Sequence, residues 1–168
     1  MSGSLPRGVK VIIGRMKTNN KINVRVRLVV IHNGKVLVQY REKDKYYHYI
    51  GGHLEYGETI EKACIRETQE ECGNDVNFEF QKILYIRDFI HTNDNEHSVE
   101  LFILGTIDKT KGLEGLKDPQ HPDGSIWLTW LDIYNLPDNL FPKSLSPVLL
   151  ADYKNTFPIQ GKYVGEIE

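Results

Sequence analysis

Three glutamates between positions 67 and 71 are the side chains of this sequence best suited to chemistry. Glu67, Glu70 and Glu71 stand at i, i+3 and i+4, which places them on one face of a helix with Cβ atoms about 6 Å apart. Each pair of carboxylates at that distance repels by roughly 3 kcal/mol at an effective dielectric constant near 20. Magnesium is bound in proteins by one or two carboxylates together with substrate phosphates. The spacing therefore predicts a cation site on this helix.

A solvated acidic face on a surface helix is the alternative to a metal site, and for a pair of glutamates alone it is the commoner case. Two features of the flanking sequence favour the metal site. The preceding turn of the same stripe is apolar, with Ile60, Ala63 and Cys64, so the acidic face points toward the body of the protein. A loop beginning with Gly51 and Gly52 leads into the helix, and glycine lets bare backbone approach a ligand.

The stretch from Gly52 to Asn74 resembles the signature of the Nudix hydrolase family, of the MutT type. Two positions that are usually aliphatic in that family hold Thr68 and Asn74 here, where Thr68 can pack through its methyl and Asn74 suits a left-handed exit from the helix. Every polar and glycine position of the signature is met: Gly52, Gly57, Glu58, Arg66, Glu67, Glu70, Glu71 and Gly73.

The resemblance implies a metal-dependent hydrolase that cleaves the pyrophosphate bond of a nucleoside diphosphate linked to another moiety. Such substrates include nucleotide sugars, nucleoside triphosphates and related dinucleotides. Bound Mg²⁺ or Mn²⁺ would neutralise phosphate charge and lower the pKa of the attacking water. The implied metal ligands are the Gly51 carbonyl and the carboxylates of Glu67, Glu70 and Glu71.

The same resemblance assigns roles to the other signature residues. Glu67 and Glu70 are grouped with Arg66 as the catalytic set, in which Glu67 acts on the water and Arg66 pairs with Glu58 to hold the loop against the helix. The three glycines are expected to be structural: Gly52 and Gly57 shape the loop, and Gly73 closes the helix.

Candidates outside the signature have weaker support. Glu100, in an expected strand at 98–107, could complete the metal site, with an acid at a strand edge as an equal alternative. Asp118, His121 and Asp123, in a long loop at 108–124, could supply a base or a substrate contact, although such residues are more often solvated. The candidates for binding substrate are Arg25, Arg27, Arg41, Tyr47 and His53, with Tyr46 and Tyr49 as alternatives to Tyr47 for stacking on a base.

The chain of 168 residues, 40% of them hydrophobic, is expected to form a single domain over residues 1–168. No apolar run approaches the ~20 residues of a membrane span, so a membrane is not an expected partner. Cys64 and Cys72 lie about 12 Å apart along the expected helix and cannot bridge each other. Free thiols and the lack of an apolar signal core at the N-terminus indicate a cytoplasmic setting.

Charge is distributed unevenly along the chain. The net charge is −2, but residues 1–50 hold 11 Lys and Arg against two acids, a balance of +9, so the remainder carries −11. A basic first half beside an acidic helix suits a nucleotide-type polyanion bridged by metal, with cations on exposed strand faces as an equal alternative. Nucleic acid is not favoured as a partner, because no basic run is interleaved with aromatics. A homodimer is left open.

The elements that position these residues follow from turn and periodicity signals. Asn33-Gly34 predicts a tight hairpin between strands at 24–31 and 36–40. Thr59 is the expected N-cap of the signature helix. Further strands are expected at 9–13, 47–50, 76–90, 98–107 and 126–131, with a helical turn at 132–136 and a last helix at 144–153. A mixed sheet between helices results, and the resemblance implies the same α/β fold, an α/β/α sandwich.

Two other functions compete with hydrolysis of a small nucleotide. A non-catalytic Nudix-like module that senses a nucleotide usually loses one or more of the acidic positions, whereas this chain keeps them all. An enzyme that removes RNA caps would need a basic groove and salt-dependent RNA binding. Among small substrates, the long loop at 108–124 slightly favours a nucleotide sugar or another nucleoside diphosphate derivative, because it could cover a second moiety.

Overall fold

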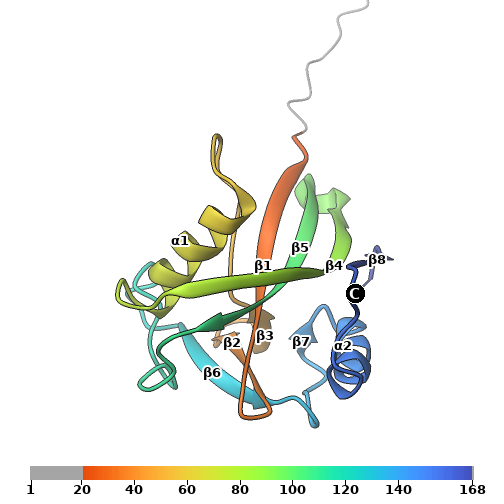
Figure 1. Cartoon of the computed structure of the whole chain (residues 1–168). Helices are drawn as coiled ribbons and strands as arrows, with labels where there is room; N and C mark the ends of the chain where they lie inside the picture. The colour runs from red at the N-terminus through yellow and green to blue at the C-terminus, as the bar shows by residue number, and fades with distance from the viewer. Residues whose placement is uncertain (1–20, 168) are drawn as a thin grey trace, which may run out of the picture.

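The computed structural model describes residues 21–167, which form an eight-stranded mixed sheet and two helices (Figure 1). The strand order is β7-β3-β2-β1-β5-β4-β8, with β6 paired to β2. The strand expected at 9–13 lies outside the described residues. The elements are β1 (Asn23–His32), β2 (Lys35–Arg41), β3 (Tyr46–Tyr49), α1 (Ile60–Cys72), β4 (Phe78–His91), the 3-10 turn η1 (Thr92–Asp94), β5 (Glu96–Ile107), β6 (Ile126–Asp132), β7 (Leu140–Phe141), α2 (Leu145–Lys154) and β8 (Lys162–Gly165).

Strand β1 joins two halves of the sheet. It pairs in parallel with β5 over residues 23–30, but meets β2 only beside the hairpin, through Ile31–Val36 and His32–Lys35. At the other end of β1 the signature loop takes the place of β2, because the amide of Val26 donates to the Gly52 carbonyl at 2.9 Å. The loop is therefore held between the two halves.

The predicted hairpin is confirmed. Asn33 and Gly34 both have positive φ, 50° and 73°. Two successive residues with positive φ form the type I′ turn whose twist matches antiparallel strands. This local signal fixes the register of β1 against β2, and with it the direction in which the arginines of β1 point.

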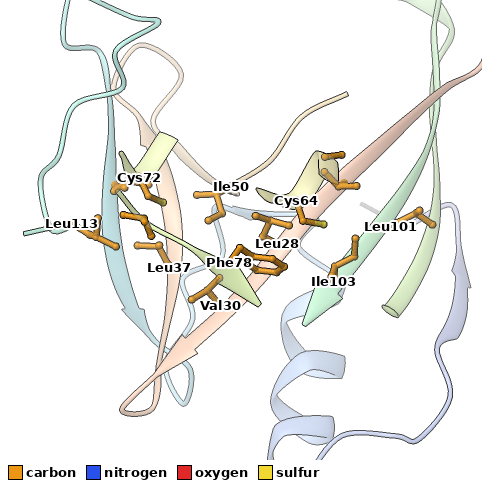
Figure 2. Packing of buried hydrophobic residues seen from close by; sticks show 14 residues of the cluster. Leu28, Val30, Leu37, Ile50, Cys64, Cys72, Phe78, Leu101, Ile103 and Leu113 are labelled. Carbon is orange, nitrogen blue, oxygen red and sulfur yellow. The ribbon is translucent and has the colours of Figure 1, made fainter. Parts of the chain in front are cut away.

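The two helices cover opposite faces of the sheet, which confirms the expected α/β/α sandwich. Val26, Leu28 and Val30 of β1 pack into a core shared with Cys64 and other residues of α1 (Figure 2). The intervening residue Val29 packs into a second core with Leu145 and Leu149 of α2. Because successive strand residues face opposite sides, α1 and α2 lie on either side of β1.

The signature helix begins and ends where the sequence predicts. The Thr59 hydroxyl accepts a hydrogen bond from the Lys62 amide at 3.3 Å, as an N-cap does. At the other end the positive φ, 119°, falls on Gly73 and not on Asn74, so the left-handed exit expected of Asn74 is wrong. Thr68 is buried, and its hydroxyl donates to the Cys64 carbonyl at 2.8 Å, so it fits the core.

Other differences from the expected elements lie in the last third of the chain. The helical turn expected at 132–136 is a hydrogen-bonded turn, with the Asn135 amide donating to the Asp132 carbonyl at 3.0 Å. Strands β7 and β8 were not predicted, and β8 adds in parallel to the outer edge of β4. Within residues 21–167, neither helix has the length and apolar character that a membrane crossing requires.

Candidate active site

A pocket of about 850 Å³ lies between α1, the signature loop and both halves of the sheet. One wall is acidic and carries Glu67, Glu70 and Glu71 of α1. The wall that belongs to β1 and β4 is cationic and carries Arg25, Arg27 and Arg87. This volume lies in the range of pockets that bind small molecules.

The acidic wall consists of one half-buried and two buried carboxylates. Glu67 and Glu71 are 6% and 9% exposed, whereas the Glu70 side chain is 37% exposed. Within residues 21–167, no three His, Cys, Asp or Glu side chains converge closely enough to enclose an ion. The carboxylates have protein partners instead: Glu67 accepts from Arg66 at 2.7 Å, and Glu71 accepts from the Gly51 amide at 2.9 Å.

Burial dominates the electrostatics of this wall. It raises the pKa of the Glu71 carboxyl well above its ordinary value, and the charge of Glu67 adds to that rise. Burial likewise raises the pKa of Glu67, against the opposing effect of Arg66. Buried carboxylates on one helical face gain from a nearby positive charge, and oxygen donors of this kind suit a hard dication. The chemistry of the donor set therefore fits Mg²⁺ or Mn²⁺.

Arg66 ties the helix to the loop, as expected. Its Nε and Nη2 donate to the two oxygens of Glu58 at 2.9 and 3.0 Å, a bidentate pair, and Nη2 also donates to the His53 carbonyl at 2.9 Å. The hydrogen bond from Arg66 lowers the pKa of Glu58. Because Nη1 reaches Glu67, the same guanidinium orients a pocket carboxylate.

Two glycines allow the loop to pass close to its neighbours. Gly51 has a φ of 122°, and a Cβ there would lie 2.3 Å from the Val26 carbonyl oxygen. A Cβ on Gly52 would lie 2.6 Å from Oε1 of Glu67. Both distances are shorter than packed atoms tolerate, so both positions lack room for a side chain, and the positive φ of Gly51 favours glycine in addition. Gly57, with a φ of 82°, allows a further turn of the loop before the helix.

Glu100 is bound by arginines and does not join the acidic wall. It is 3% exposed, and its Oε1 accepts from Arg27 at 3.0 Å while its Oε2 accepts from Arg87 at 2.5 Å. Burial alone would raise the pKa of Glu100, but the two guanidiniums outweigh it, and the pKa lies below its ordinary value. Its place is thus that of a buried anion shared by two cations at the pocket, and its part in a metal site stays a prediction.

Four of the five residues expected to bind substrate line the pocket, namely Arg25, Arg27, Arg41 and His53. Tyr47 does not: its ring lies 4.8 Å from that of Tyr40 and packs against the core around α2. Because side chains alternate along β3, the neighbours Tyr46 and His48 face the pocket in its place. Of the three tyrosines considered for stacking on a base, Tyr46 and Tyr49 line the pocket and Tyr47 does not.

His48 is held neutral by its surroundings. Its Nδ1 lies 3.2 Å from the Tyr49 carbonyl, and its buried Nε2 has no hydrogen-bond partner among the described residues. Burial lowers the pKa of His48 to about 3, with the charge of Arg27 adding to the effect.

The long loop reaches the pocket through part of its length. Asp118 and His121 line the pocket and are joined at 2.9 Å between Oδ2 and Nδ1. Gln120, between them, donates to Oε2 of Glu70 at 3.3 Å. Asp123 faces elsewhere and pairs with Lys43 at 2.8 Å.

Several pocket residues carried no signal that the sequence could have revealed. Gln120 and Phe141 belong to the pocket only because strand faces and loop paths place them there. Arg87 had one signal, a cation within the long expected strand at 76–90, but its partner Glu100 is brought opposite it by the pairing of β4 with β5.

Comparisons with known proteins agree with this geometry. A protein-family model described as NUDIX domain matches residues 22–149. A MutT NUDIX hydrolase from Burkholderia pseudomallei is similar with a TM-score of 0.60 and 20% identity, over 78% of this chain and 97% of that one. A NUDIX hydrolase from Nitrosomonas europaea has a TM-score of 0.65 and 15% identity, over 87% of this chain and 78% of that one. An ADP-ribose pyrophosphatase from Streptococcus suis has a TM-score of 0.58 and 14% identity, over 87% of this chain and 100% of that one. At these identities the structures show a shared fold.

Proposed function

The chain belongs to the Nudix family, and from that premise we propose that it hydrolyses the pyrophosphate bond of a nucleoside diphosphate linked to another moiety. The observation that carries the proposal is the pairing of two walls in one pocket, three carboxylates on α1 facing arginines on β1 and β4. A diphosphate needs positive charge on both sides, from arginines on one and from metal held by carboxylates on the other.

We propose Mg²⁺ or Mn²⁺ as the cofactor, held by Glu67, Glu70, Glu71 and the Gly51 carbonyl. When bound, such an ion supplies positive charge to the phosphates and acidifies the attacking water. We propose that Glu67 accepts the proton that leaves the attacking water. Arg66 fixes Oε1 of Glu67, and burial raises the pKa of the Glu67 carboxyl, which makes it a stronger base.

The remaining residues bind and orient the substrate in this proposal. Arg25, Arg27 and Arg41 supply cations to the phosphates, and His53, beside Arg25, borders the same wall. The loop at 108–124 contacts the acidic wall, where Gln120 donates to Glu70. This contact supports a nucleotide carrying a second moiety, and among the similar structures one is an ADP-ribose pyrophosphatase. Free Cys64 and Cys72 support a reducing, cytoplasmic setting.

The test is formation of the nucleoside monophosphate, followed by chromatography, from nucleoside triphosphates, nucleotide sugars and dinucleoside polyphosphates, each with Mg²⁺ and with a chelator. Glu70→Gln keeps the shape of the side chain and removes the charge, and we expect it to lower turnover by about 100-fold, since even indirect disturbance of metal ligands costs 10–100-fold. The matched control is Glu61→Gln on the same helix, which is exposed and outside the pocket.

The outcomes separate the competing functions. If Glu70→Gln and the wild-type protein form the nucleoside monophosphate at the same rate, the carboxylate wall is not the catalytic centre. If no compound is hydrolysed but a nucleotide raises the melting temperature of the wild-type protein, a sensing module replaces the hydrolase.

A further inference from the structure

The chain segment 158–167, which follows α2, is attached along the outer edge of β4. Lys82 of β4 donates to the Pro158 carbonyl at 3.0 Å. Strand β8 then pairs in parallel with β4, from Tyr85 opposite Lys162 to Arg87 opposite Gly165. Before β8 the backbone runs so close to β4 that a Cβ on Gly161 would lie 2.9 Å from the Ile83 carbonyl oxygen. These contacts hold the segment at a defined position. It lies wholly beyond the residues 22–149 that match the family.

A buried carboxylate anchors β8 to both neighbouring elements. Asp152 of α2 is 8% exposed, and its Oδ1 accepts from Lys162 at 2.5 Å while its Oδ2 accepts from the Tyr85 hydroxyl at 2.9 Å. Charged hydrogen bonds at a buried carboxylate are the strong ones in proteins. Segment 158–167 is therefore docked through side chains as well as through backbone pairing.

Ile167, at the C-terminal end of the segment, accepts a hydrogen bond from Arg87, which lines the pocket. Nε of Arg87 donates to the Ile167 carbonyl at 2.7 Å, and Nη1 of Arg87 donates to Glu100 at 2.5 Å. The guanidinium also lies over the Phe89 ring, 5.0 Å from its centroid. A planar group bound at two points has a fixed plane, so the segment determines how Arg87 faces the pocket.

The contacts continue from Arg87 to the signature loop. Glu100 is shared with Arg27, whose Nε donates to it at 3.0 Å. Nη1 of Arg27 in turn reaches the Gly51 carbonyl at 3.4 Å. An unbroken series of polar contacts thus joins the Ile167 carbonyl to the loop beside α1.

We propose that segment 158–167 is a positioning element of the substrate pocket, which orients Arg87 and, through Glu100 and Arg27, the loop at Gly51. That the pocket binds a nucleoside diphosphate group rests on the proposed function. Arg87 adds a cation to the diphosphate-binding wall only while Ile167 holds its plane. Displacing the segment weakens binding of a diphosphate more than it slows the chemical step, because Arg87 loses its partner directly whereas Gly51 keeps its hydrogen bond to Glu71 of α1.

The experiment displaces the segment with Gly161→Val and compares it with Ile159→Ala, a change at a residue that is 94% exposed. We expect Gly161→Val to raise KM, and the Kd of ADP measured by calorimetry, about tenfold, the loss of one charge-assisted hydrogen bond. We expect kcat to change by less than about threefold and Ile159→Ala to change neither constant. Lys162→Met, which removes the cation at Asp152, is a milder displacement for use if Gly161→Val does not fold.

A double-mutant comparison separates positioning from general stability. In an Arg87→Met background the displacing substitution has no further effect on KM or on the Kd of ADP, if the segment acts through Arg87. Equal tenfold losses with and without Arg87 would overturn the proposal.

A third readout needs no turnover, so the failure of hydrolysis and the failure of positioning remain distinguishable. In the wild-type protein the Arg87 Nε–H gives an NMR signal protected from exchange, and Gly161→Val removes that protection and shifts the Arg27 Nε–H signal. An unchanged Arg27 signal after loss of the Arg87 signal refutes the series of contacts, whether or not any nucleotide is hydrolysed.

Discussion

Acidification should destabilise this protein through His48, a half-buried histidine that faces the pocket and whose Nε2 is buried. Burial lowers its pKa from 6.5 to about 3. A group with a lowered folded-state pKa contributes stability that is present above the unfolded pKa and is lost as the pH falls toward the folded pKa. The window for His48 therefore runs from about pH 6.5 down to pH 3.

The size of the effect follows from the width of that window. Each pH unit inside it lowers the free energy of unfolding by about 1.4 kcal/mol, so His48 alone removes about 2 kcal/mol between pH 7 and pH 5. For a protein of ordinary stability this is a considerable fraction of the total.

The assay is urea unfolding at pH 7, 6 and 5 for the wild-type protein, His48→Gln and His32→Gln. His48→Gln cannot take up the proton, so its free energy of unfolding should fall by about 2 kcal/mol less than that of the wild type over this range. His32, an exposed residue of the hairpin, is the matched control. Parallel pH dependences for all three proteins would show that the His48 environment is not the one described. So would an NMR titration in which the His48 ring gains its proton near pH 6.

Three further predictions concern the pocket and the core. Gly52→Ala places a Cβ 2.6 Å from Oε1 of Glu67. We therefore expect turnover to fall at least about tenfold while the melting temperature changes little. An unaltered rate would contradict the close approach of Gly52 to Glu67. Gly105→Ala places a Cβ 2.1 Å from the Phe78 ring, and we expect a loss of about 1–3 kcal/mol in urea unfolding. Thr106→Ala, at the next residue of β5 and exposed, is the comparison and should lose less. Glu71→Gln removes a buried charge, so it should raise the melting temperature of the metal-free protein at pH 8. The rise in melting temperature that Mg²⁺ and ADP together give the wild-type protein should be absent from this variant.

The parts of the fold that the sequence predicts well are those set by local chemistry. Asn33-Gly34 specifies its hairpin because few residue pairs accept two positive φ angles. Thr59 specifies the start of α1 because its hydroxyl satisfies a free amide of the first turn. The clustering of the α1 carboxylates follows in the same way from helical spacing.

The parts that could not be predicted depend on pairing between distant segments. Glu100 looks like a metal ligand in the sequence, and only the registers of β1 and β4 against β5 bring Arg27 and Arg87 to it. Tyr46 and Tyr47 are neighbours of the same type, and a shift of one residue decides which faces the pocket. Strands β7 and β8 are too short to give a periodic signal, since they form by adding to edges that already exist.

The buried thiols of α1 can be used to measure local opening of the helix that carries the carboxylates. Cys64 and Cys72 are 0% and 3% exposed, and burial raises the pKa of each to about 12, so neither reacts in the closed protein. A thiol reagent can modify them only during excursions in which α1 lifts from the sheet, and the labelling rate then reports the free energy of that opening. Slower labelling on addition of a nucleotide would mark ligands that bind across α1, without any need to know which bond is cut.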